Sequence, residues 1–205
     1  QLAIQVGIAV QQAELYDRVQ SLNVYLEQKV NQRTAKLQRS IKFETMTHKV
    51  MKKMRDSLDE LQILQTVTQE IGQVLNIDRC KIELYNGDRT KAEVAYEYTK
   101  ASPNCQGRSR IIADFPELDA QLLQKQSLQF VEFVPELNPL QTQATRLVCP
   151  ICDDQGVLGN LWLLRPKEAY FEADEIMLVE QVANQCAIAI RQARLYQQSQ
   201  IQVQE

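Results

Sequence analysis

The stretch LVCPICDDQGVLGNLWLLRPKEAYFEADEIMLVEQVANQCAIAIRQARLY, residues 147–196, decides the fold. Apolar runs at 146–152 and 157–165 flank the turn-forming sequence Asp154-Gln155-Gly156, which predicts an antiparallel hairpin. From about Ala173 the apolar residues recur three and four positions apart, which predicts a helix. They are Ile176, Val179, Ala183, Cys186 and Ile190. A hairpin followed by a closing helix indicates an α+β domain.

The sequence before this stretch predicts the other half of the same domain. Residues 57–60 read Ser-Leu-Asp-Glu, a capping-box pattern with Ser57 at the N-cap and Glu60 three residues later, so we expect a helix from here to about Leu75. Alternating apolar residues on both sides of Asn86-Gly87 predict a first hairpin. Between the two hairpins, short strands at 109–113 and 127–133 are expected to flank a helix at about 117–125.

The two ends of the chain resemble each other. Residues 1–20 and 181–200 are identical at ten of twenty positions without gaps, including the pairs Leu15/Leu195 and Tyr16/Tyr196. Two amphipathic helices can share composition by chance, but the shared order favours a repeat with the length of a domain. We therefore predict that residues 1–14 end a preceding domain, 15–55 form a linker helix, 56–200 form the second domain and 201–205 begin another linker.

The linker is predicted to be one long helix that pairs with a second copy. No glycine lies between Gly7 and Gly72, and the first proline is Pro103, so helix-breaking residues are absent. Apolar residues fall in two rows with an eleven-residue step and together form one narrow stripe, which needs a partner helix. A parallel homodimer is the prediction, and a helix folded back on its own domain is the alternative. The expected interface residues are Leu15, Val19, Leu22, Leu26, Val30, Leu37 and Ile41.

Composition and charge argue against several classes of protein. The net charge is −3, although residues 27–55 carry nine Lys and Arg against only two acidic residues. Those cations recur at helical spacing, which indicates a solvated helix face, so we predict neither a nucleic-acid nor a membrane partner. The longest apolar runs are too short to span a bilayer. Five cysteines, an odd number, predict a reducing and therefore cytoplasmic location.

Two segments carry a family resemblance. RDSLDELQILQTVTQEIGQVLNIDRCKIELYN, residues 55–86, resembles the opening of GAF domains in cyanobacterial phytochrome-like sensors, and residues 147–196 are similar to their close. The resemblance is strong over 56–100 and 145–200 and weak over 101–144. It implies a six-stranded antiparallel sheet with the first and last helices on one face and a ligand pocket on the other. It also implies a non-catalytic module that passes signals to an output domain such as a histidine kinase.

No residue pattern in the domain predicts catalysis or a bound cofactor. Bilin-binding relatives attach their chromophore through a Cys-His pair that this sequence lacks, and Cys105 is not in the usual setting of their second attachment cysteine. His48, the only histidine, lies on the linker in a sequence unlike that of a phosphoacceptor site. We therefore expect no enzyme activity and no cofactor.

Cys149-Pro-Ile-Cys152 is the one candidate for metal or redox chemistry, because a C-x-x-C pair can bind zinc or an iron–sulfur cluster. A four-ligand site needs a second pair, which is missing. In a regular strand positions 149 and 152 also point to opposite faces. We predict that both cysteines serve packing. A cysteine-based redox or metal sensor, and a purely architectural dimerisation spacer, stay as alternatives to the signalling module.

Overall fold

The computed structural model describes residues 2–100, 104–133, 143–166 and 169–204. The chain divides into two compact units, Gln1–Glu44 and Thr45–Glu205, which are described separately. The first unit is part of α1, a helix that runs from Leu2 to Arg55. This helix confirms the predicted long helix. Every side chain from residue 11 to residue 38 is exposed. The predicted stripe residues are 47–63% exposed; they are Leu15, Val19, Leu22, Leu26, Val30, Leu37 and Ile41.

The second unit is built on a six-stranded antiparallel sheet with the order β3-β2-β1-β6-β5-β4. The strands are β1 (Arg79–Tyr85), β2 (Lys91–Thr99), β3 (Ser109–Ile111), β4 (Leu128–Phe133), β5 (Gln143–Asp153) and β6 (Gly156–Pro166). The hairpins β1–β2 and β5–β6 are far apart in sequence, and antiparallel pairing of β1 with β6 joins them at the centre. This arrangement confirms the predicted α+β fold class.

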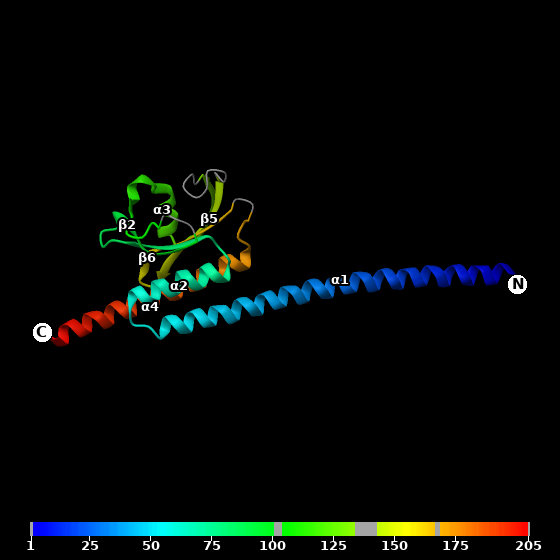
Figure 1. Cartoon of the computed structure of the whole chain (residues 1–205). Helices are drawn as coiled ribbons and strands as arrows, with labels where there is room; N and C mark the ends of the chain where they lie inside the picture. Colours follow the sequence, from blue (N-terminus) through cyan, green and yellow to red (C-terminus); the bar gives the residue numbers. More distant parts are fainter. Residues whose placement is uncertain (1, 101–103, 134–142, 167–168, 205) are drawn as a thin grey trace. The chain divides into compact units, whose positions relative to one another are not determined.

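Helices cover both faces of this sheet (Figure 1). The helices α2 (Glu60–Val74) and α4 (Ala173–Gln204) lie on one face, here called the inner face. The short helix α3 (Pro116–Leu123) lies on the opposite, outer face, after a 3-10 turn at Ile112–Asp114. The predicted elements at 117–125 and from Ala173 onward are therefore present.

The last turns of α1 belong to the second unit. Val50 and Met54 are buried, and Lys49 and Lys53 form ion pairs with Glu70 of α2. The unit consequently starts at Thr45. α1 itself ends at Arg55, next to the predicted domain boundary at residue 56.

The predicted capping box is wrong. The N-cap of α2 is Asp59, whose Oδ1 accepts a hydrogen bond from the backbone N–H of Leu61 at 2.9 Å. Ser57 lies outside the helix, and its hydroxyl contacts the side chain of Gln62 instead. Both residues are good N-caps by type. The backbone N–H of Ser57 still donates to the carbonyl of Met54 in the last turn of α1, and α2 begins only at Glu60.

One glycine in the sheet is required by close packing. A Cβ on Gly159 of β6 would lie 2.0 Å from the carbonyl oxygen of Glu83 on the neighbouring strand β1. A real Cβ cannot approach backbone this closely, so a glycine allows β1 and β6 to pair at this point.

Candidate functional site

The outer face of the sheet is lined by charged and polar side chains. Side chains alternate between faces along a strand, so β1 directs Arg79, Lys81 and Glu83 to the outer face, while Cys80 and Ile82 point inward. On β6 the outer-face residue is Trp162, which packs with Leu122 of α3 in an apolar cluster. The outer face therefore combines aromatic and apolar side chains with several charges.

An ion network joins α3 to the sheet. Arg110 of β3 donates to Glu83 at 3.0 Å and to both carboxylate oxygens of Asp119 on α3, at 2.5 and 2.8 Å. Both acids are buried. Burial by itself would lower the pKa of Arg110, but the hydrogen bonds and charges of these acids raise it above its ordinary value. The guanidinium is thus held permanently charged between two carboxylates.

Tyr85 and Asn160 extend this network along the sheet. The Tyr85 hydroxyl donates to Asp119 at 3.0 Å and accepts from the Asn160 side-chain amide at 2.8 Å. Burial raises the pKa of Tyr85 to about 12, so the phenol stays protonated and keeps donating. The network positions α3 and contains no nucleophile beside a base, so it does not resemble a catalytic site.

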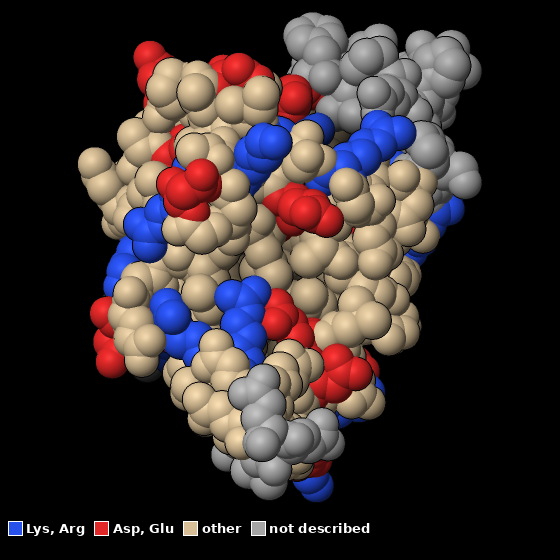
Figure 2. Space-filling view, turned by 90° about the vertical axis from the view of Figure 1, so that its left-hand side faces the viewer, with Lys and Arg blue, Asp and Glu red and all other residues tan. Residues whose placement is uncertain are grey.

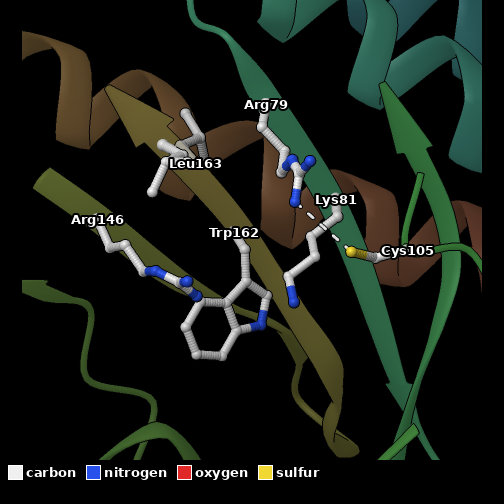
Figure 3. A pocket seen from close by; sticks show the side chains of 7 residues that line it. Arg79, Lys81, Cys105, Arg146, Trp162 and Leu163 are labelled. Carbon is white, nitrogen blue, oxygen red and sulfur yellow. Dashed lines mark hydrogen bonds between the residues drawn. The ribbon is translucent and has the colours of Figure 1, made fainter. Parts of the chain in front are cut away.

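A cavity of about 200 Å³ opens beside Trp162. Its charged lining residues are Arg79, Lys81 and Arg146. Figure 3 shows the indole of Trp162 between Arg146 on one side and Lys81 on the other. The Lys81 ammonium is 5.1 Å and the Arg146 guanidinium 5.7 Å from the ring centre, distances at which cations are attracted to an aromatic face.

Each of these cations also has an acidic partner. Arg79 lies 3.0 Å from Glu97, and Lys81 lies 2.6 Å from Glu83. Figure 2 shows the same intermixing on one side of the molecule, where blue and red side chains lie close together. The pairs hold the cations in place around the cavity.

Cys105, from the loop between β2 and β3, closes one side of the cavity. Its sulfur accepts a hydrogen bond from Arg79 at 3.5 Å, drawn as a dashed line in Figure 3. Its backbone N–H donates to Glu97. The loop is thereby attached to the cations of β1.

The structure corrects the prediction that Cys149 and Cys152 point to opposite faces. β5 and β6 shift register between Ile151 and Cys152, where β6 carries one extra residue, Leu158, so the regular alternation of faces does not extend to Cys152. The Cys152 sulfur lies 3.4 Å from Asn184 of α4. Cys149 also lies on the inner face, because it pairs directly with Leu161, which in turn pairs with the inward-pointing Ile82 of β1.

Cys80, Cys149 and Cys186 have the properties of packing residues, whereas Cys105 and Cys152 are half-buried. Burial raises the pKa of Cys149 and of Cys186 to about 12, and it also raises the pKa of Cys80. All three are fully buried. In the described part of the chain no group of three or more His, Cys, Asp or Glu could hold a metal ion.

Comparison with known proteins identifies the domain. The family model described as "GAF domain" matches residues 59–190. The chain belongs to the GAF family. GAF domains are generally non-catalytic regulatory modules found in multidomain proteins. A search among curated proteins gives no match. No helix in the described residues is long and apolar enough to cross a membrane.

Solved GAF structures share this fold. A phycoerythrobilin-bound GAF domain from a cyanobacterial phytochrome is 18% identical, with a TM-score of 0.62 over 76% of this chain and 97% of its own. A GAF domain from a phosphoenolpyruvate-protein phosphotransferase of Coxiella burnetii is 13% identical, with a TM-score of 0.64 over 77% and 97%. A GAF/HD domain protein from Geobacter sulfurreducens is 14% identical, with a TM-score of 0.58 over 67% and 95%. At these identities the likeness shows the fold alone.

Sequence reasoning missed the residues of the Trp162 cavity. Alternation in β1 shows only that Lys81 and Glu83 lie on the face opposite Cys80 and Ile82, and a solvent-facing side would have the same pattern. Lys81 and Glu83 form an ion pair near the centre of the sheet, on the face that α3 covers, and only the strand order shows this position.

Proposed function

We propose that this GAF domain is a sensory module that passes structural changes along the helices of a parallel homodimer to an output domain. The observation that carries the proposal is the apolar stripe of α1, whose members from Leu15 to Leu37 are exposed. A mostly polar helix of this length is marginally stable in water unless its apolar side is covered. A second copy offers the same stripe in the same direction.

The repeat between the two ends of the chain supports the same proposal. Leu15 at the start of the α1 stripe is 63% exposed, and its counterpart Leu195 near the end of α4 is 65% exposed. The two helices that enter and leave the domain therefore present equivalent residues. In a dimer in which both α1 and α4 pair with their copies, a movement of the helix that enters the domain can be passed to the helix that leaves it.

The test is the mass of the chain in solution. Burial of one Leu or Val side chain contributes roughly 1.5–3 kcal/mol, so several pairs can exceed the cost of association. Light scattering should give a dimer for the wild type and a monomer for the double variant Leu26→Asp, Val30→Asp. The control Gln28→Asp, Gln32→Asp adds the same charge on the opposite side of the helix and should stay dimeric. Equal masses for all three proteins would contradict the proposal.

Disulfide formation tests the direction of the helices. A single cysteine introduced at Leu15, or separately at Leu37, meets its own copy only in a parallel, in-register pair. Both variants should form covalent dimers under mild oxidation, and the wild type should not. If neither forms covalent dimers, the stripe packs in another way.

The output that the family resemblance implies is a histidine kinase. Incorporation of labelled phosphate from ATP by the full-length protein is the measurement for this part of the proposal. A regulatory GAF domain with a different output would incorporate none and would still form the dimer.

A further inference from the structure

We propose that the Trp162 cavity binds a small organic carboxylate. The first observation is the indole N–H of Trp162, which has no hydrogen-bond acceptor among the described residues. The residue is only 6% exposed. Buried donors are nearly always paired, so an unpaired one in the wall of a cavity indicates a site for an acceptor atom.

The charges of the cavity select an anion. The described charged residues that line it are all cations: Arg79, Lys81 and Arg146. Their acidic partners are not part of the lining. An acceptor that carries negative charge gains the attraction of these cations as well as the N–H hydrogen bond.

Among the three cations, Arg146 can most easily exchange its acidic partner for the carboxylate of a ligand. Its ion pair with Glu132 is the most exposed of those around the cavity, because the Glu132 side chain is 44% exposed. By contrast, the partners of Arg79 and Lys81, which are Glu97 and Glu83, are buried. Exposed ion pairs contribute little to stability, so exchange of Glu132 for a ligand carboxylate costs little.

Size and apolar lining limit the rest of the ligand. About 200 Å³ is below the roughly 300–1,000 Å³ of sites for drug-sized molecules. Leu164 and the carbon atoms of Trp162 supply apolar surface. The fitting ligand is a carboxylate attached to one small apolar group. This inference gives a ligand class to the sensory role proposed above, and the binding can be measured independently of dimerisation.

Trp162 provides a direct readout, because it is the only tryptophan of the chain. In a nitrogen–proton correlation spectrum its indole N–H gives one signal. Benzoate should shift this signal in a saturable manner, as expected for a new hydrogen bond. Benzyl alcohol, which has the same ring without the charge, should shift it much less, and acetate should bind more weakly than benzoate.

Two variants locate the interaction. Arg146→Gln should weaken benzoate binding about tenfold or more, the loss expected from removal of one charge-assisted hydrogen bond. Arg33→Gln, which removes the same charge from the exposed part of α1, should bind like the wild type. The amide signals of each variant serve as the check that the domain is folded.

Three results would overturn the inference: an indole signal that benzoate does not move, equal binding of benzyl alcohol and benzoate, or unchanged affinity in Arg146→Gln. The monomeric variant Leu26→Asp, Val30→Asp should still bind benzoate. If it binds while the wild type proves monomeric, only the dimer proposal fails. If the wild type is dimeric and benzoate has no effect, only the ligand proposal fails.

Discussion

On the inner face of the sheet, Ile82, Leu147 and Leu161 are buried under α2 and α4. On the outer face, Glu83 and Asp119 are buried as well, but they are held there by Arg110. Apolar burial stabilises the inner face directly. The outer face removes charges from water, which costs free energy that ion pairing only partly returns. The inner face therefore contributes most to stability, whereas the outer face holds the charged groups beside the proposed ligand cavity.

The largest effect on stability is expected from a cavity in the inner face. Leu161 is fully buried, so Leu161→Ala should lower the free energy of unfolding by about 4 kcal/mol. The control Leu58→Ala removes a half-exposed side chain and should change it by less than about 0.5 kcal/mol. Urea denaturation measures both. Similar losses in the two variants would show that Leu161 is not part of the stabilising core.

A smaller loss is expected on the outer face. Arg110→Met should lower the free energy of unfolding by about 3 kcal/mol, because two buried carboxylates lose their shared partner. If charge imbalance is the cause, the further changes Glu83→Gln and Asp119→Asn in the same protein should restore part of the loss. Equal stability of Arg110→Met and the wild type would refute the structural role of this network.

The smallest effect is expected in the reactivity of the cysteine thiols. Thiols buried on the inner face should react more slowly than half-buried ones. The thiolate is the reactive form, and burial raises the pKa of the inner-face thiols of Cys149 and Cys186 to about 12. At slightly alkaline pH, a thiol reagent should react quickly only with the half-buried Cys105 and Cys152. All five cysteines should react after denaturation.

Single substitutions identify which cysteines supply the rapidly reacting thiols. Cys105→Ala should remove one rapidly reacting thiol, whereas Cys149→Ala should remove none. The double variant Cys149→Ala, Cys152→Ala should have the same low iron and zinc content as the wild type. Stoichiometric metal in the wild type that is lost in the double variant would establish the redox or metal sensor instead.

The sequence alone determined the elements and the class of fold, because local patterns encode them. The turn at Asp154-Gln155-Gly156 and the periodicity after Ala173 each depend on residues a few positions apart. The absence of glycine between Gly7 and Gly72 determined α1 in the same way. The family resemblance, confirmed by the match over residues 59–190, rested on the same local segments.

Only the tertiary structure decided where the chemistry lies. Cys152 contacts Asn184 of α4 at a register shift caused by one extra residue in the partner strand β6, and the pattern of β5 alone gives no sign of it. The Trp162 cavity brings together β1, β5, β6 and the loop of Cys105, whose residues are separated by many positions in sequence. Burial of charge depends on which elements cover a face, here α3 on the outer one. Contacts between distant segments are set by packing, so periodicity and spacing could predict the sheet but not what its outer face holds.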